Sequence, residues 1–138
     1  MFGFSVTNYR RYADLPLDTF ELMKYKVYVL DLKWNYLFVN NAVLIDLPHL
    51  DRGLTGLNMW TVFSELQNDA TFQQMKKDIE QGRQVNLTTA SPITLKRLRI
   101  SGWPLDDCYL FTVNTLPDKT ELLNELRGLL NKTTSPGE

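Results

Sequence analysis

The chain has 138 residues, 43% of them hydrophobic and 22% charged, which is the size and composition of one ordinary globular domain. Its 15 Lys and Arg residues are balanced by 16 Asp and Glu residues, and the net charge of -1 excludes the basic excess that nucleic-acid binding needs. Apolar runs are short and no secretory pattern opens the chain, so we expect no membrane segment and a cytoplasmic location.

The N-terminal part predicts an irregular arm over residues 1–16 and a short flanking helix. The segment LPLDTFELMKYK, which starts at Leu15, places Leu17 and Phe20 on an apolar side. Pro16 is a residue type suited to the start of a helix. We therefore expect this helix to precede the first strand.

Two β-rich runs follow in the stretch VYVLDLKWNYLFVNNAVLIDL, which starts at Val27. Aromatic and β-branched residues, the types favoured in strands, flank a polar turn around Asp31 and Asn35. Asn40 or Asn41 is suited to cap a helix directly after the second run. The stretch predicts a hairpin that leads straight into a capped helix.

The middle of the chain predicts one well-defined helix before three strands. Residues 69–81 place Phe72, Met75 and Ile79 at helical spacing. Before this helix, Pro and Gly residues break a connecting region that has a helical turn or two around residues 59–66. After it, strands are expected at residues 84–90, 95–103 and 108–115.

This order of elements predicts an α+β fold, in which helices cover one face of an antiparallel sheet. A last amphipathic helix is expected at residues 118–132, where Leu122, Leu126 and Leu129 fall on one face. Such an apolar stripe packs against the chain's own sheet or against a second chain. The final residues, 133–138, are expected to be disordered.

Over residues 17–130 the order of these motifs resembles that of a PAS domain. The first hairpin turn departs from the family, since it carries Trp34 and Asn35 where an acidic residue and glycine are common. The matches are Asp31 and Asn40 at the ends of the first two strands, Gly56, Trp60 and Phe63 in the next helical segment, Pro104 and Leu105 at a strand end, and Asp118 and Thr120 in a closing Asp-x-Thr motif.

The resemblance implies a five-stranded antiparallel sheet with helices over one face, an N-terminal flanking helix and a C-terminal amphipathic helix. It also implies a sensor of the bacterial two-component kind, which passes a signal through its terminal helix to an output domain or protein. Asp118 and Thr120 would couple the sheet to that helix. The expected division is an arm at 1–16, a PAS-like domain at 17–117, an exit helix at 118–132 and a tail at 133–138.

The resemblance further implies a cavity between helices and sheet that senses a small molecule. Aromatic residues and methionine at helical spacing are also what an ordinary packed core shows, so an interior that binds nothing stays an alternative. The candidate ligand-binding residues are Asn40, Trp60, Phe63, Phe72, Met75, Ile79, Thr112 and Asn114.

Two cofactor-binding variants of the family lack their marker residues in this chain. The helix at residues 69–81 has no histidine to ligate haem, and His49, the one histidine, lies in a loop segment. The Asn-Cys-Arg motif that binds flavin covalently in LOV domains is missing, and Cys108 follows two aspartates that raise a thiol pKa. We expect a structural thiol, no haem, no covalent flavin, no metal site and no enzymatic activity.

Two functions remain open at this point. One is a sensory module that binds a small ligand or a partner within the PAS core. The other is an interaction domain without a ligand, which forms a homodimer through Leu122, Leu126 and Leu129.

Overall fold

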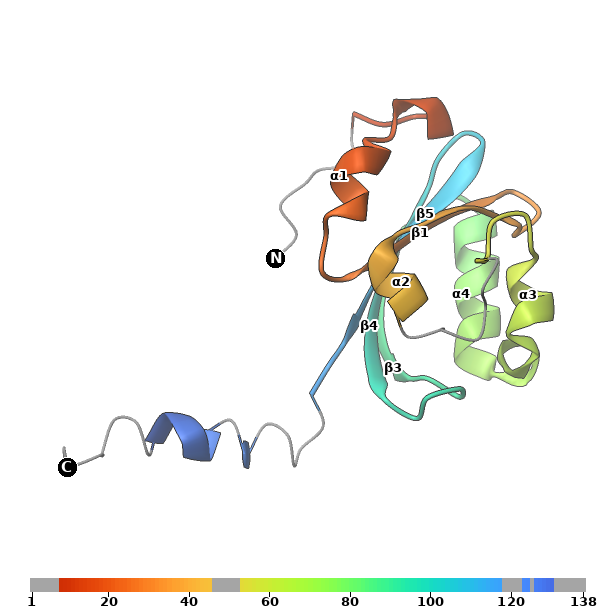
Figure 1. Cartoon of the computed structure of the whole chain (residues 1–138). Coiled ribbons are helices and arrows are strands. Elements are labelled where there is room, and N and C mark those ends of the chain that lie inside the picture. Colours follow the sequence, from red (N-terminus) through yellow and green to blue (C-terminus); the bar gives the residue numbers. More distant parts are fainter. Residues whose placement is uncertain (1–7, 46–52, 118–122, 125, 131–138) are drawn as a thin grey trace.

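A five-stranded antiparallel sheet with the strand order β2-β1-β5-β4-β3 organises the chain (Figure 1). The computed structural model describes residues 8–45, 53–117, 123–124 and 126–130. The expected α+β fold with a five-stranded antiparallel sheet is confirmed. The strands are β1 (Lys26–Asp31), β2 (Tyr36–Val39), β3 (Val85–Ala90), β4 (Arg97–Pro104) and β5 (Cys108–Thr115).

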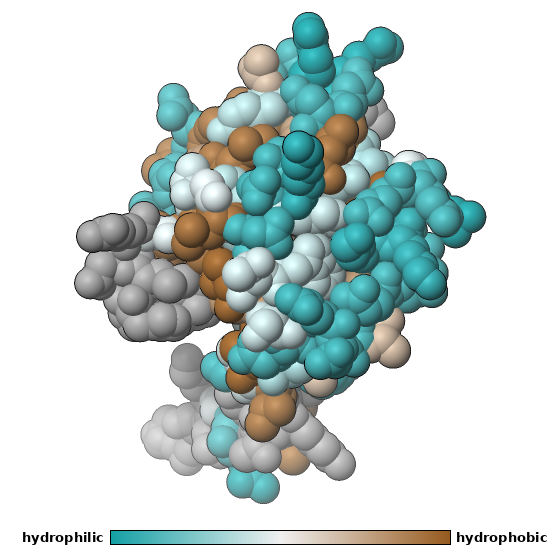
Figure 2. Space-filling view, turned by 90° about the vertical axis from the view of Figure 1, so that its right-hand side faces the viewer, coloured by the Kyte–Doolittle hydropathy of each residue, from teal (hydrophilic) through white to brown (hydrophobic). Residues whose placement is uncertain are grey.

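Short helices lie on both sides of this sheet, with α3 and α4 on one side and α1 on the other (Figure 1). The surface that carries α3 and α4 is mainly hydrophilic, because these helices turn their apolar residues toward the sheet (Figure 2). The helices are η1 (Tyr12–Asp14), α1 (Leu17–Glu21), α2 (Asn41–Ile45), α3 (Met59–Val62), η2 (Ser64–Asn68) and α4 (Ala70–Glu80).

The turn between β1 and β2 is held by the Asp31 carboxylate. Its Oδ1 accepts hydrogen bonds from the backbone N–H groups of Lys33 at 2.8 Å and Asn35 at 2.9 Å. Its Oδ2 accepts from Nδ2 of Asn35 at 3.2 Å. An aspartate that binds the backbone just after itself is a common way to close a tight turn. The predicted polar turn is therefore confirmed.

The sheet and helices α2 to α4 enclose the larger of two apolar clusters, the inner cluster. Since alternate residues of a strand point to opposite faces, β5 contributes Tyr109, Phe111 and Val113 to it. The helix α4 begins after Asp69, which caps it, since Oδ1 of Asp69 accepts from the N–H of Phe72 at 3.0 Å. All three residues that α4 buries belong to the inner cluster, namely Phe72, Met75 and Ile79.

Gly102 lets α4 lie close to the sheet. It pairs with Phe111 across β4 and β5, and a Cβ atom at this position would lie 2.6 Å from Cε1 of Phe111 and 3.2 Å from Cδ1 of Ile79. Both distances are shorter than ordinary van der Waals contact. Only glycine leaves room for these two side chains.

The opposite face of the sheet carries a smaller apolar cluster, the outer cluster, which α1 and the segment before it cover. Strand alternation again selects its members, since Val27 and Val29 of β1 point away from the inner cluster. The buried residues of the outer cluster are Leu15, Phe20, Val27, Val29, Cys108 and Leu110.

The flanking helix expected from Leu15 is shorter than predicted. The structure ends α1 at Glu21, and Lys26 already pairs with Val113 in the ladder between β1 and β5. Sheet pairing of the residues after α1 thus overrides the helical pattern of the segment.

The C-terminal amphipathic stretch is helical at residues 123–124 and 126–130 and extends away from the sheet in Figure 1. Leu123, Leu126 and Leu129 are 45%, 47% and 59% exposed, so they do not pack on the sheet. Within the described part of the chain, no helix has the length and apolarity that crossing a bilayer requires.

Candidate functional site

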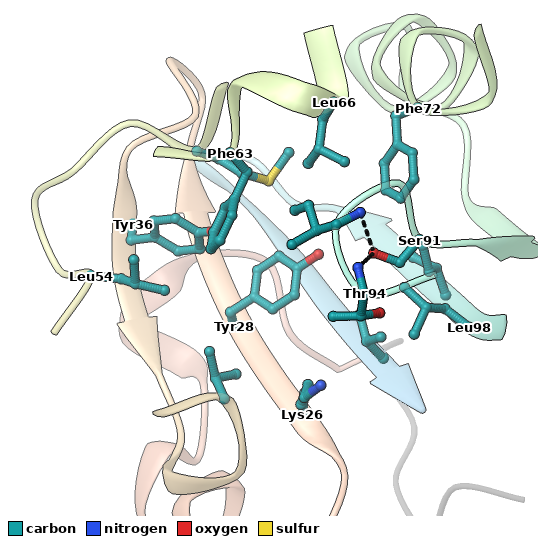
Figure 3. A pocket seen from close by; sticks show the side chains of 15 residues that line it. Lys26, Tyr28, Tyr36, Leu54, Phe63, Leu66, Phe72, Ser91, Thr94 and Leu98 are labelled. Atoms are coloured by element: carbon teal, nitrogen blue, oxygen red, sulfur yellow. Dashed lines mark hydrogen bonds between the residues drawn. The ribbon is translucent and has the colours of Figure 1, made fainter. Parts of the chain in front are cut away.

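A mostly apolar cavity of about 150 Å³ lies between the inner face of the sheet and the helices (Figure 3). The sheet forms its floor, helical residues form one wall, and the loop between β3 and β4 closes another side. Its lining residues are Lys26, Tyr28, Tyr36, Val43, Leu54, Met59, Phe63, Leu66, Phe72, Ser91, Ile93, Thr94, Leu98, Ile100 and Val113.

Two tyrosines of the opening hairpin form the aromatic floor of the cavity. The Tyr28 ring stacks on Phe111 with ring centroids 5.3 Å apart and 16° between the planes. The same ring meets Tyr36 edge to face at 5.8 Å. Offset stacking and edge-to-face contacts are the favoured arrangements of aromatic pairs, so both rings are held in fixed positions.

No hydrogen bond joins the hydroxyl group of Tyr28 or Tyr36 to another described residue, and both side chains line the cavity, with Tyr36 buried and Tyr28 partly buried. In Figure 3 the Tyr28 hydroxyl points into the cavity. Burial raises the pKa of both phenols above the ordinary value of 10.0. Both groups therefore stay protonated at physiological pH and remain hydrogen-bond donors.

The loop between β3 and β4 is held mainly by bonds within itself. The Ser91 hydroxyl oxygen accepts from the backbone N–H of Ile93 at 3.1 Å and of Thr94 at 3.2 Å. The backbone N–H of Ser91 donates to the carbonyl of Lys96 at 2.8 Å. These bonds satisfy the buried Ser91 and present the loop as a preformed wall of the cavity.

Of the candidates predicted on the helical side, Phe63 and Phe72 line the cavity. Trp60, Met75 and Ile79 belong to the inner cluster but are not among the lining residues, so they fill the core beside the cavity. Their position agrees with the alternative stated above, in which methionine and aromatic residues at helical spacing form a packed core and contact no ligand.

Asn40 is fully buried and uses its amide to hold the chain together rather than to line the cavity. Its Oδ1 accepts from the backbone N–H of Val27 at 3.1 Å and of Val43 at 3.3 Å. Its Nδ2 donates to the carbonyl oxygens of Phe20 at 3.0 Å and Tyr25 at 2.9 Å. The predicted helix cap is therefore Asn40, and it also joins α1 to the hairpin.

Thr112 and Asn114 lie on the other face of the sheet from the cavity. Their strand neighbours Phe111 and Val113 point inward, and alternation turns Thr112 and Asn114 outward. The composition of β5 predicted polar groups for a ligand on that strand. The polar residues that line the cavity instead come from the hairpin and from the loop between β3 and β4, and they include Tyr28, Tyr36 and Ser91. The alternation of the hairpin was the signal that could have found these tyrosines.

Cys108 points into the outer cluster and is fully buried. Burial, together with a hydrogen bond and charge from Asp107, raises the pKa of this thiol to about 12. A thiol with so high a pKa is almost entirely uncharged at neutral pH and is a poor nucleophile. The remaining predicted residues Asp118, Thr120 and Leu122 lie outside the described residues.

No protein-family model and no curated protein matches the chain. Solved structures do resemble it. The PAS domain of BvgS from Bordetella pertussis is 13% identical, with a TM-score of 0.62, and the match covers 87% of this chain and 97% of that one. These values describe a likeness of fold over nearly all of both chains.

Two further structures show the same likeness. The photoactive yellow protein domain of the sensor histidine kinase Ppr from Rhodospirillum centenum is 12% identical, with a TM-score of 0.57 over 75% of this chain and 95% of that one. The PAS domain of the quorum-sensing receptor RpfR from Cronobacter turicensis, solved in complex with BDSF, is 10% identical, with a TM-score of 0.54 over 69% of this chain and 96% of that one.

Proposed function

This chain has the PAS fold, and from that premise we propose that it is a sensory module of a signalling protein, which binds a small molecule in the cavity above Tyr28 and Tyr36. Neighbours of the same fold are described as parts of a sensor histidine kinase and of a quorum-sensing receptor. The proposal assigns the chain a binding role and no catalytic reaction.

The observation that carries this proposal is the Tyr28 hydroxyl, which points into the cavity and forms no hydrogen bond with another described residue. A phenol hydroxyl that faces a hollow can donate a hydrogen bond to a molecule that enters the hollow. Tyr36 lines the same hollow. A ligand oxygen close to the Tyr28 hydroxyl would accept this bond.

The size and lining of the cavity favour a compact, mostly apolar ligand that carries one acceptor group. A cavity of about 150 Å³ is comparable to engineered cavities that hold benzene. Phe63, Phe72 and the aliphatic residues around them would contact the apolar body. A short-chain or single-ring carbonyl compound has this combination of properties.

The proposal is tested by purifying the chain and looking for a bound small molecule by native mass spectrometry. The molecule found, or one selected from a library of single-ring carbonyl compounds by thermal shift, is then titrated against Tyr28→Phe. This variant removes one hydroxyl and keeps the ring, so we expect affinity to fall about tenfold. Tyr109→Phe is the matched control, because Tyr109 is buried in the inner cluster but does not line the cavity.

Equal affinity of the wild type and Tyr28→Phe would contradict the assigned role of the phenol. If the chain carries no molecule and a bulkier side chain at the cavity wall, as in Ile100→Phe, raises stability, the interior is a core that binds nothing. Ile100 is buried and lines the cavity, so added atoms at this position would fill it.

The exposed leucines favour a second role, homodimer formation through the C-terminal helix. Leu126 and Leu129 are spaced by three residues and lie on one face, and their exposure leaves them free to meet a second copy. Analytical ultracentrifugation should show a dimer that Leu126→Glu weakens. Leu22→Glu is the control, since Leu22 is 85% exposed at the end of α1. A monomer at high micromolar concentration would contradict this role.

A further inference from the structure

The outer face of the sheet is apolar where α1 covers it and polar over β3, β4 and the end of β5. Strand pairing sets the polar side chains in rows across the strands. Asn86, Ser101 and Thr112 form one row, because Asn86 pairs with Ser101 and Ser101 with Thr112. Arg99 and Asn114 pair in the adjacent row. A polar sheet face is ordinarily a flat solvated surface.

Here the polar side chains instead line a cleft of about 680 Å³. The cleft lies on the other side of the sheet from the cavity with the two tyrosines, so the two sites share no lining residue. The described residues that line the cleft are Tyr25, Gln84, Asn86, Arg99, Ser101, Trp103 and Asn114.

Two buried residues with hydroxyl groups belong to this part of the sheet, Ser101 in the lining of the cleft and Thr112 beside it on β5. Ser101 is only 6% exposed, and its neighbour Thr112 is fully buried. The Oγ1 atom of Thr112 has no hydrogen-bond partner. A surface that merely faced bulk water would leave such side chains exposed, so this part of the face is recessed and incompletely satisfied.

The charge of the cleft is positive. Arg99 is the charged residue among the described lining residues, and its guanidinium forms no ion pair or hydrogen bond with any described residue. An adjoining hollow, which shares Tyr25 and Asn114, is also lined by Lys24. No carboxylate belongs to the described lining of either hollow. An arginine in this setting favours an anion from outside the chain.

We propose that this outer-face cleft binds a small organic anion, with Arg99 holding its carboxylate or phosphate group. The side-chain amides of Asn86 and Asn114 and the Ser101 hydroxyl supply further donors around that group. Trp103 and Tyr25 also line the cleft and offer aromatic surface to a ring or an apolar part of the ligand. The site is independent of the inner cavity.

Nuclear magnetic resonance with benzoate and phenyl phosphate tests the proposal. These probes share one ring and differ in the anionic group, so the tighter one identifies the preferred chemistry. We expect saturable shifts of the Asn86 and Asn114 side-chain amide signals at millimolar probe, weakened about tenfold in Arg99→Gln. Arg97→Gln is the matched control, because Arg97 lies two residues away on the same strand face and is not a lining residue.

Three outcomes would overturn the proposal. The shifts could fail to saturate, they could fall equally in Arg97→Gln and Arg99→Gln, or they could appear only at inner-cavity residues such as Phe63. The last outcome would instead support the proposed ligand site above the tyrosines. Sodium chloride at matched ionic strength must leave the amide signals in place, since a general salt effect would move them without a specific site.

Discussion

Asn40 joins three backbone segments through one buried side chain, since its partners lie in α1, in β1 with the residue before it, and in α2. Asn40→Ala would leave two backbone N–H donors and three carbonyl acceptors with fewer partners. We expect the free energy of unfolding to fall by about 3 kcal/mol, measured by urea denaturation.

Asn41→Ala is the control for this prediction. Asn41 is the next residue and is exposed, so its side chain contributes little to the interior. We expect that variant to lie within about 0.5 kcal/mol of the wild type. Equal losses in the two variants would contradict the role assigned to the Asn40 amide.

Asp31 makes the stability of the hairpin turn dependent on pH. Burial raises its pKa, but hydrogen bonds from Asn35 and Lys33 outweigh burial and hold the pKa below the usual 3.8. A carboxyl whose pKa is lower in the folded state stabilises the protein above pH 4, and this contribution is lost as the pH falls through the folded pKa. Asp31→Asn should therefore lower stability at pH 7 by about 1 kcal/mol.

Urea denaturation at pH 7 and pH 3 checks the sign. The stability gap between wild type and Asp31→Asn should narrow at pH 3, because the carboxyl of the unfolded chain, with its usual pKa of 3.8, is mostly protonated there. Asp106→Asn should show no such gap, because the exposed Asp106 carboxylate bonds to no described residue. A gap of constant size would mean that the Asp31 charge does not matter.

At the scale of elements, Trp34 fastens the hairpin tip to α4. Its indole is buried, its ring lies 5.2 Å from Trp60, and its Nε1 donates to Oε2 of Glu80 at 2.9 Å. Its backbone has φ of 70°, in the left-handed region that favours glycine. The contacts of the indole thus hold a bulky residue in a backbone conformation that favours glycine.

This conflict predicts that glycine is the more stable replacement for Trp34, whereas at most positions alanine is more stable than glycine. Trp34→Gly and Trp34→Ala both lose the indole, but only glycine relieves the backbone, so Trp34→Gly should be more stable by about 1 kcal/mol. The neighbouring residue Lys33 is exposed and its φ is not positive. We therefore expect the Lys33→Ala variant to be at least as stable as Lys33→Gly. Urea denaturation of the four variants measures both differences.

The positions of helices and strands could be predicted where the apolar residues follow one clear spacing, that of a helix or that of a strand. The β-branched and aromatic runs of the hairpin and the apolar face of α4 were sufficient to predict both. The end of α1 was not predictable, because pairing between Lys26 and Val113 depends on a strand more than 80 residues later. The site was predictable only in part. The apolar face of a helix points inward, which identified Phe72, whereas alternation along a strand does not say which face of the sheet holds Thr112.

At the scale of the whole molecule, the N-terminal segment acts as a cover over the outer face of the sheet. Phe20 and Cys108 are both fully buried in the outer cluster beneath it. Phe20→Ala removes a large apolar contact and should cost about 3 kcal/mol. We expect the cover to open more often and a thiol reagent to label Cys108 faster than in the wild type.

Leu22→Ala controls for a general effect of altering this part of the chain. Leu22 follows α1 directly and is 85% exposed, so its removal should leave the labelling rate unchanged. Fast labelling of the wild-type thiol would contradict the closed cover, because both burial and the high pKa of Cys108 slow the reaction.

The rings beneath the cavity form an unbroken series that ends in a pair of indoles. Tyr28 stacks on Phe111, Phe111 lies 5.9 Å from Trp34, and Trp34 meets Trp60 edge to face. Two of the three tryptophans of the chain are thus electronically close to each other and two rings away from a hydroxyl that faces the hollow. We expect the circular dichroism of this indole pair to change when a molecule enters the hollow, which would allow binding to be followed without a label.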